Sequence, residues 1–308
     1  MMRTSPVKGS VLLIAAFAVV ASACGSSSSS TPAGGLTSPA GNTVCSSVDK
    51  SGTDLLAKIC ASGVLRVSTD PAYPPQSSYD QATGTWQGFD IDVADAIAKR
   101  LGVTVQWKTP AWGVITAGSW DGRWDVSVGS MTITKERAQV LDFTTPYYYT
   151  PAGLAVQKGS SITSFAQLAG KTVGSCGACT YEYYLERKLN IPGYSFQYVV
   201  PANVTIKTYN TDSTAIQDLV LGRLDAAMSA EPTLQEAVNK GKPIQLLGGP
   251  VFYEPLAVAI DKSAPEDPAG LTSRLDDVIN DLHTDGTLTS LSMKWYHQDL
   301  TVSQPQAA

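Results

Sequence analysis

Three segments set the fold class: VLRVST at 64–69, FDIDVADAIAKRL at 89–101 and VTVQWK at 103–108. The first and third are short runs rich in β-branched residues, which is typical of strands. In the second, apolar residues recur every fourth position up to a stop at Gly102, which predicts a helix. A strand, a helix and a second strand in this order predict a βαβ unit with parallel strands.

The same alternation continues along the chain. We expect further strands at 124–130, 171–175, 204–209 and 224–229, and further helices at 114–120, 181–189, 213–221 and 232–240. Ser164 and Gln167 form a capping box for one more short helix. The sequence therefore predicts an α/β fold with mainly parallel sheets.

Ligands of open α/β sheets bind beyond the carboxyl ends of the strands. The polar residues at these ends are Asp70, Tyr73, Thr132, Thr134, Arg137, Cys176, Cys179, Thr180, Tyr181 and Glu231. Such a set suits a small zwitterion, because Arg137 would bind a carboxylate bidentately and an acid would hold an ammonium group. Tyr73 or Trp112 would flank an aliphatic or cationic group.

The chain begins with a predicted export signal. Residues 1–10 carry two basic side chains, and residues 11–20 are all apolar. Ten residues cover only about 15 Å of helix, half of a bilayer core, so the run predicts a signal peptide and not a spanning helix. Ala-Ser-Ala-Cys at 21–24 resembles a bacterial lipobox, which implies cleavage after residue 23 and a lipid on Cys24. The alternative is an ordinary signal with an incidental cysteine.

Residues 25–44 are rich in Ser, Gly, Pro and Thr and carry no charge. We expect residues 24–44 to be a flexible linker that tethers a folded, extracytoplasmic domain to the outer face of the cell membrane.

Composition excludes several functions. The 308 residues suggest about two domains at the usual ~150 residues each. A net charge of −5 and no long basic run make nucleic acid a poor partner. With two histidines and no Cys/His ligand spacing, we expect neither a metal site nor a cofactor.

Four cysteines remain after Cys24, and they allow three disulfide connectivities. Their spacing favours Cys45–Cys60 together with Cys176–Cys179. The Cys-Gly-Ala-Cys run has two interpretations. It is either a redox centre at a helix N-terminus or a small disulfide that stiffens a ligand-facing loop.

Several motifs together resemble one family, the extracellular solute-binding proteins of family 3, which are substrate receptors of polar amino-acid ABC importers. The motifs are LRVSTDPAYPP at 65–75, GFDID at 88–92, GSMTITKER at 129–137, DFTTPY at 142–147, KTVGSCGACTYE at 171–182, GRLDA at 222–226 and DGTLTSLSMKW at 285–295.

The resemblance implies a two-lobed periplasmic-binding-protein type II fold that closes on its ligand. Crossover strands would lie near 149–154 and 250–256. Lobe 1 would then comprise 45–152 and 253–308, and lobe 2 would comprise 153–252. The resemblance also implies a monomer whose partners are ABC permease subunits and a small polar solute, most simply an amino acid.

By position, the resemblance assigns ligand contacts to Asp70, Tyr73, Trp112, Gly129, Ser130, Thr132, Arg137, Cys176, Thr180 and Tyr181. This chain departs from the pattern at two positions. Cys179 replaces a hydroxyl donor, and Ala230 stands where an aspartate normally holds the α-ammonium group. Glu231 would serve in its place if the turn shifts by one residue. Otherwise Asp70 holds the positive end alone.

The resulting interpretation is a membrane-tethered receptor without enzymatic activity. Two alternatives stay open. One is a dehydratase of the cyclohexadienyl type on the same fold, with Asp70 and Glu231 as an acid/base pair. The other is a thiol–disulfide oxidoreductase that uses Cys176 and Cys179.

Overall fold

The computed structural model describes residues 43–303, which lie within a compact unit that starts at Asn42. The predicted signal peptide, the lipid site at Cys24 and almost all of the linker lie outside the described residues. No helix in the described part is both long and apolar enough to span a membrane.

The described elements alternate as predicted. In chain order the first half contains α1 (Val44–Ser47), α2 (Leu55–Ser62), β1 (Val64–Ser68), β2 (Ala72–Tyr73), β3 (Ser77–Asp80), β4 (Thr85–Gln87), α3 (Phe89–Leu101), β5 (Thr104–Lys108), α4 (Trp112–Thr116), β6 (Val126–Thr132), α5 (Arg137–Val140), β7 (Leu141–Phe143) and β8 (Tyr148–Gln157). The second half contains η1 (Phe165–Leu168), β9 (Thr172–Cys176), α6 (Thr180–Leu185), β10 (Thr205–Tyr209), α7 (Asp212–Val220), β11 (Ala226–Ala230), α8 (Glu231–Asn239), β12 (Ile244–Leu246), β13 (Phe252–Asp261), α9 (Ala269–Thr284) and α10 (Thr287–Tyr296).

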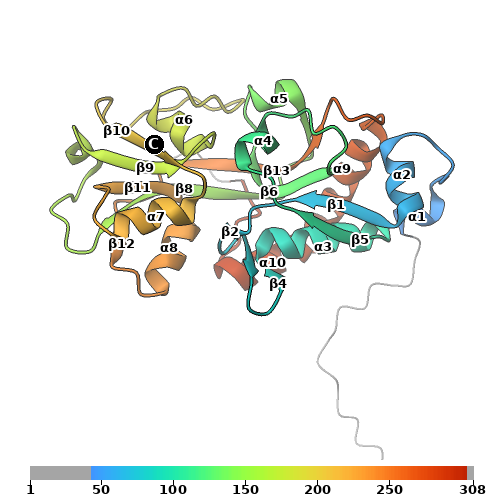
Figure 1. The fold of residues 1–308 in the computed structure, drawn as a ribbon, viewed down its shortest axis with the longest axis horizontal. Helices are drawn as coiled ribbons and strands as arrows, with labels where there is room; N and C mark the ends of the chain where they lie inside the picture. Colours follow the sequence, from blue (N-terminus) through green and yellow to red (C-terminus); the bar gives the residue numbers. More distant parts are fainter. Residues whose placement is uncertain (1–42, 304–308) are drawn as a thin grey trace, which may run out of the picture. The chain divides into compact units, whose positions relative to one another are not determined.

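One long sheet joins two lobes (Figure 1). Its order is β10-β9-β11-β8-β13-β6-β1-β5, with β12 paired to β8 and β7 paired to β13. Strands β1, β5 and β6 are parallel to one another in lobe 1, and β9, β10 and β11 are parallel in lobe 2. The ten-residue strands β8 and β13 are antiparallel to each other and connect the two groups. In Figure 1, α6 lies on one side of the lobe 2 strands and α7 and α8 lie on the other.

The β8–β13 pairing coincides with the predicted crossovers. Its register runs from Tyr148 opposite Leu256 to Ala152 opposite Phe252. The largest core cluster draws its residues from 45–148 and 256–300, and a second cluster draws all but Tyr73 from 152–252. The exact lobe boundaries stay a prediction.

Helix α3 has the predicted bounds. Its stop, Gly102, has a left-handed φ of 85°, a conformation that costs glycine little. Acidic residues lie in its first turn and basic residues in its last, which favours both helix ends. Phe89, Val93, Ile97 and Leu101 are fully buried in the lobe 1 core. The predicted apolar face is therefore the packing face of this helix.

Helix α4 differs from its prediction, because it ends at Thr116 and not at residue 120. The chain turns directly afterwards, with positive φ at Gly118, Ser119 and Asp121. A left-handed backbone cannot continue a helix. The prediction also lacked the small sheet of β2, β3 and β4 and the C-terminal helices α9 and α10.

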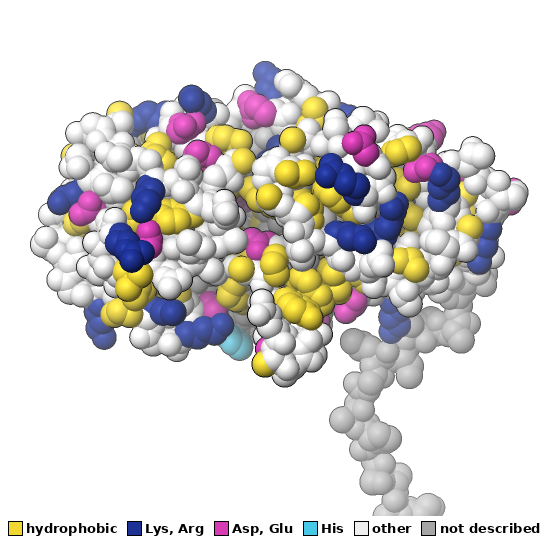
Figure 2. Space-filling model, in the orientation of Figure 1, with side chains coloured by type: hydrophobic (Ala, Val, Ile, Leu, Met, Phe, Trp, Pro, Cys, Tyr) yellow, Lys and Arg dark blue, Asp and Glu magenta, His cyan; other side chains and the backbone are white. Residues whose placement is uncertain are grey.

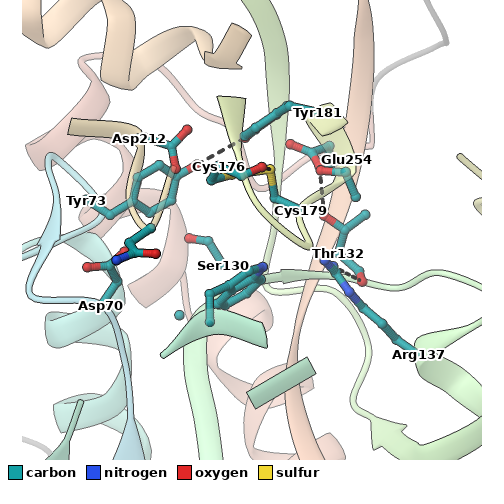
Figure 3. Close-up of a pocket in the computed structure, with 14 residues that line it drawn as sticks. Asp70, Tyr73, Ser130, Thr132, Arg137, Cys176, Cys179, Tyr181, Asp212 and Glu254 are labelled. Atoms are coloured by element: carbon teal, nitrogen blue, oxygen red, sulfur yellow. Dashed lines mark hydrogen bonds between the residues drawn. A yellow bond between two sulfur atoms is a disulfide. The ribbon is translucent and has the colours of Figure 1, made fainter. Parts of the chain in front are cut away.

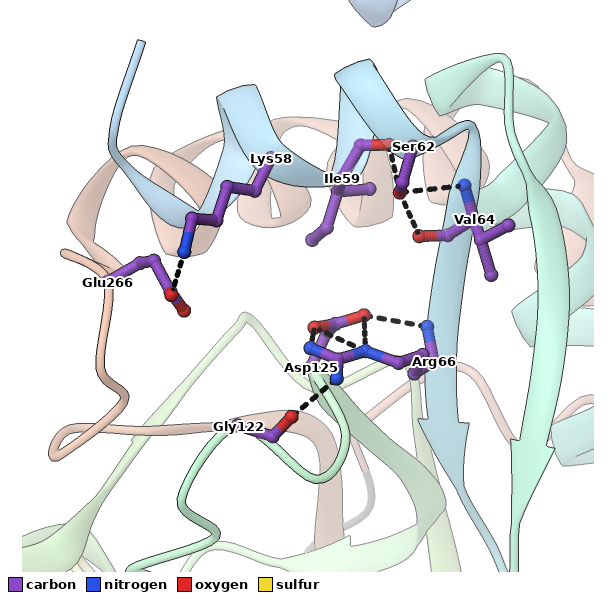
Figure 4. A network of polar contacts seen from close by, with 8 residues as sticks. All are labelled: Lys58, Ile59, Ser62, Val64, Arg66, Gly122, Asp125 and Glu266. Atoms are coloured by element: carbon purple, nitrogen blue, oxygen red, sulfur yellow. Dashed lines mark hydrogen bonds and ion pairs between the residues drawn. The ribbon is translucent and has the colours of Figure 1, made fainter.

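The N-terminal segment is fixed to lobe 1 by covalent and polar contacts. The disulfide Cys45–Cys60 joins α1 to α2, as the cysteine spacing predicts. Lys58 of α2 pairs with Glu266, and the Arg66 guanidinium on β1 binds both Asp125 and the carbonyl oxygen of Gly122 (Figure 4). The Lys58–Glu266 pair therefore ties α2 to the segment before α9, and the Arg66 contacts tie β1 to the loop that precedes β6.

Candidate ligand-binding site

A pocket lies where the two lobes meet. Its walls are formed by Asp70, Tyr73, Trp112, Gly129, Ser130, Thr132, Arg137, Cys176, Cys179, Thr180, Tyr181, Asn210, Asp212 and Glu254 (Figure 3). On the face shown in Figure 2, acidic atoms lie beside a hollow between the lobes. The cavity volume is only about 30 Å³, room for about two water molecules at the ~10–15 Å³ that each needs.

The parallel strands bring these residues together. Asp70 follows β1, Thr132 ends β6, Cys176 ends β9 and Asp212 follows β10. All four strands therefore end at the same cleft, as expected for an α/β sheet. Ten of the eleven predicted ligand residues line the pocket.

Arg137 contributes the pocket's only guanidinium group. Its Nη1 donates to the Thr132 carbonyl oxygen and its Nη2 to the Ala178 carbonyl oxygen, both at 3.0 Å. The guanidinium also lies 5.4 Å from the centroid of the Trp112 ring. Its side chain is buried, and within residues 43–303 its Nε has no hydrogen-bond partner. Thr134, named with the strand-end residues, lies outside the pocket and accepts a hydrogen bond from the backbone N–H of Arg137.

Glu254, on β13, occupies the side of the pocket that holds Arg137. Its Oε1 accepts a hydrogen bond from Thr132 Oγ1 at 2.8 Å and another from Thr180 Oγ1. Burial raises the pKa of this carboxyl, while these hydrogen bonds and Arg137 act in the opposite direction. The two hydroxyls expected to face the ligand are thus bound to a carboxyl group of the protein itself.

Two further acids, Asp70 and Asp212, lie on the other side of the pocket, with the Tyr73 ring between them (Figure 3). Asp212 is 5% exposed, and its Oδ1 accepts a hydrogen bond from Ser229 Oγ at 2.5 Å. Burial, helped by the nearby charges of Asp70 and Glu254, raises the pKa of Asp212 to about 7, although the hydrogen bond from Ser229 acts in the opposite direction. Burial also raises the pKa of Asp70, whose Oδ1 accepts a hydrogen bond from the backbone N–H of Ala72.

Several contacts bridge the lobes at the pocket. The Tyr73 and Tyr181 hydroxyls are hydrogen-bonded, and Trp112 Nε1 donates to the Ala178 carbonyl oxygen at 3.2 Å. The Cys176–Cys179 disulfide closes the β9–α6 turn that carries this carbonyl. Both cysteines are buried, which is unlike the accessible thiols of redox centres. This geometry favours the structural interpretation of the disulfide.

Ser130 lines the pocket, but its hydroxyl is engaged elsewhere. Its Oγ donates to Asp90 Oδ2 at 2.7 Å and lies 2.6 Å from the Tyr148 hydroxyl. Asp90 is fully buried beneath the site, and burial raises its pKa to about 7. Ser130 therefore anchors the pocket floor to the lobe 1 core.

Glu231 is the predicted residue that does not line the pocket. Strand β11 continues to Ala230, which pairs with Ala152, and Glu231 begins helix α8. The Glu231 side chain packs beside Gly153 and lines a separate surface depression with Trp295 and His297. The one-residue shift that would bring Glu231 to the ligand therefore does not occur. Its expected role as the ammonium partner is corrected by this geometry.

Three pocket residues were not predicted from the sequence, namely Asn210, Asp212 and Glu254. The first two follow β10, so the strand-end rule would have found them had it been applied to that strand. Glu254 lies inside the crossover strand β13, where no local pattern marks it. Within residues 43–303, no three His, Cys, Asp or Glu side chains are grouped to hold a metal ion.

The family model for bacterial extracellular solute-binding proteins, family 3, matches residues 65–298. The chain belongs to this family. Among similar members, the probable amino-acid-binding protein YxeM of Bacillus subtilis is 29% identical over 300 residues, 96% of this chain and 98% of that protein. The L-cystine-binding protein TcyJ of Escherichia coli K12 is 32% identical over 249 residues, 80% of this chain and 88% of that protein.

Solved structures agree with the family 3 assignment. The ancestral amino acid-binding protein AncCDT-1, a precursor of cyclohexadienyl dehydratase, has a TM-score of 0.67 at 30% identity over 78% of this chain and 99% of its own. An ancestral arginine-binding protein bound to glutamine has a TM-score of 0.66 at 32% identity over 77% and 99%. The predicted two-lobed, type II periplasmic-binding-protein fold is thereby confirmed.

Proposed function

We propose that this family 3 protein is a receptor that binds an amino acid between its lobes and delivers it to an ABC importer. The observation that carries the proposal is a pocket with opposite charges at its two ends. Arg137 lies at one end, and Asp70 and Asp212 lie at the other (Figure 3). A zwitterion has the complementary charges. The names of similar family members, which include amino-acid-binding proteins, support the same class of solute.

Binding requires the lobes to separate. The cavity volume of about 30 Å³ is far below the ~300–1,000 Å³ of ordinary small-molecule sites. Its walls come from both lobes, which are joined mainly through β8 and β13. An amino acid would enter an opened cleft, and closure would then exclude water and strengthen each polar contact with it. An importer would distinguish the closed, loaded receptor from the open one by its surface.

The predicted location suits this role. A lipid on Cys24 and a linker over residues 24–44 would tether the receptor to the outer face of the cell membrane, beside the permease subunits that it serves. We infer a monomer, because one chain supplies a complete pocket from its own two lobes.

We infer a receptor and not an enzyme. The acid/base pair of the dehydratase alternative required Glu231 opposite Asp70, and Glu231 lies outside the pocket. The oxidoreductase alternative required accessible thiols, and Cys176 and Cys179 are both buried. Incubation with small cyclic acids and an insulin-reduction assay test these alternatives directly, and we expect no turnover in either.

The test of the proposed function is a thermal-shift screen of the full chain, carrying Cys24→Ser and produced in an oxidising compartment. The panel contains the amino acids, their amides, betaines, polyamines and small cyclic acids. A ligand at a hundred times its Kd adds about 2.7 kcal/mol of stability, which raises the Tm by several degrees. Stabilisation by one or a few amino acids is expected. Stabilisation only by compounds that lack an α-ammonium group would overturn the amino-acid assignment.

A further inference from the structure

The charges of the pocket do not balance, and this inference about the ligand rests on the proposed function. Three carboxyl groups line the pocket against one guanidinium group. Glu254 is compensated, because two hydroxyls donate to it and the Arg137 charge acts on it. Asp70 and Asp212 also accept hydrogen bonds, but no positive charge acts on either of them.

Within residues 43–303, neither of these two acids is paired with a cationic side chain. Among the ion pairs of residues 43–303, none involves Asp70 or Asp212. The hydrogen bonds to them come from a backbone N–H and a serine hydroxyl. A carboxylate without a cationic partner is costly where water is excluded, so a pocket that holds the buried Asp212 and the half-buried Asp70 favours a bound cation.

A second, independent observation points to a ligand in the same pocket. Arg137 is 4% exposed, and its Nε is a buried donor without a partner in the described part of the chain. Buried donors are almost always satisfied, and an orphaned one at a pocket wall points to an acceptor supplied by the ligand. The ligand therefore brings an anionic group to Arg137 as well as positive charge to the acids.

We propose that Asp70 and Asp212 form a cation subsite, so that the preferred ligand is a cationic amino acid with a second positive group besides its α-ammonium. Two positive groups would face two carboxyls, and the ligand carboxylate would face Arg137. Asp212, which starts α7 beside Ser229, supplies the negative charge that Ala230 does not carry at the end of β11. The Tyr73 ring beside both acids would flank the aliphatic stem of such a ligand.

Pairs of ligands that differ in a single charged group measure the contribution of each ligand charge to binding. We would measure the Kd of the full chain for L-arginine, for L-citrulline, whose side chain is neutral, and for agmatine, which lacks the carboxylate. L-lysine and L-norleucine form a second pair. In at least one pair, the cationic amino acid should bind at least about tenfold more tightly than its neutral counterpart, since a hydrogen bond to a charged group is the stronger kind. Arginine should also bind at least about tenfold more tightly than agmatine.

Variants then assign the residues. Asp70→Asn and Asp212→Asn should each weaken binding of the cationic ligand at least about tenfold. In at least one of the two variants, the ratio between the Kd of the neutral ligand and the Kd of the cationic ligand should be smaller than in the parent protein. Glu231→Gln, an acid-to-amide change next to Ala230 but outside the pocket, should leave the Kd unchanged. Far-UV circular dichroism of each variant separates a lost contact from a lost fold.

The failures are distinguishable. If neutral amino acids bind as tightly as cationic ones in both pairs, the cation subsite is wrong and the receptor function stands. Agmatine binding as tightly as arginine would overturn the assignment of the carboxylate to Arg137. Loss of binding in Glu231→Gln with retention in Asp212→Asn would return the ammonium role to Glu231. If no amino acid binds at all, the proposed function itself fails.

Discussion

The hydroxyl oxygens of Tyr73 and Tyr181 lie 3.0 Å apart across the boundary between the lobes. Tyr73 belongs to β2 in lobe 1, and Tyr181 belongs to α6 in lobe 2. Both side chains are buried, and burial raises the pKa of both phenols well above the usual value, so both stay protonated. Their hydrogen bond is available only when the lobes approach each other. It therefore contributes to the closed form of the receptor.

This bond predicts a double-mutant cycle. Tyr73→Phe and Tyr181→Phe should each weaken ligand binding by about two- to twelvefold, because one hydrogen bond contributes roughly 0.5–1.5 kcal/mol. The double variant should be little weaker than either single variant, since the same bond is lost in all three. Isothermal titration calorimetry measures the cycle. Strictly additive losses would show that the two hydroxyls act independently.

Replacing Arg137 should abolish ligand binding and leave the fold intact. Arg137→Ala removes the orphaned Nε donor and the two hydrogen bonds to the carbonyls of Thr132 and Ala178. Arg137→Lys keeps the charge but not the planar fork, so it should also bind more weakly than the parent. We expect no detectable binding for the alanine variant and an unchanged far-UV circular dichroism spectrum. Unchanged affinity in Arg137→Ala would exclude this pocket as the site.

Asp212 is expected to favour ligand binding while it lowers the stability of the ligand-free protein. Its pKa is about 7 in the folded protein, and the ordinary value is 3.8. Between about pH 4 and 7, Asp212 is therefore protonated in the folded state and ionised in the unfolded state. Because the unfolded state binds fewer protons there, the free energy of unfolding falls as the pH rises through this window. Asp70, Glu254, Tyr73 and Tyr181 face it, and none of them supplies a compensating positive charge.

Asp212→Asn should then be more stable than the parent at pH 8, by up to about 4 kcal/mol from the difference between the two pKa values. At pH 4 the two proteins should have nearly equal Tm values, because the parent carboxyl is neutral there. Thermal unfolding without ligand at both pH values measures this. If the Tm values of Asp212→Asn and the parent differ equally at pH 4 and pH 8, ionisation of the buried Asp212 does not destabilise the folded state.

The two disulfides predict opposite phenotypes. Replacing Cys45 and Cys60 by alanine opens a loop with a sequence separation of 15 and should cost about 3 kcal/mol of stability. Ligand affinity should not change, since neither residue lines the pocket. Replacing Cys176 and Cys179 should cost less stability, because the loop separation is only 3, but it should weaken binding. Scanning calorimetry measures the stability of both double variants, and titration calorimetry measures their ligand affinity. Weaker binding without Cys45–Cys60 and unchanged binding without Cys176–Cys179 would contradict these roles of the two disulfides.

Local sequence patterns were sufficient for most of the alternating strands and helices between β1 and α8 and for their order, but not for the small β2–β4 sheet or for α9 and α10. The apolar repeat of 89–101 and its glycine stop predicted α3, because helix packing depends on residues three and four positions apart. The pattern could not reveal that β8 and β13 pair along the boundary between the lobes. Antiparallel pairing of strands about a hundred residues apart depends on the whole topology.

The sequence by itself therefore determined the α/β alternation, the family motifs and the strand-end positions of Asp70, Thr132 and Arg137. Only the tertiary structure decided which acids share their pocket. Along a strand, neighbouring side chains point to opposite faces, so a change of one position moves a residue from the ligand to the far side. Glu254 is brought into the pocket from a crossover strand in this way, whereas Glu231 is excluded because β11 ends at Ala230 and Glu231 begins α8. Side-chain direction at that scale follows from the packed backbone and not from local composition.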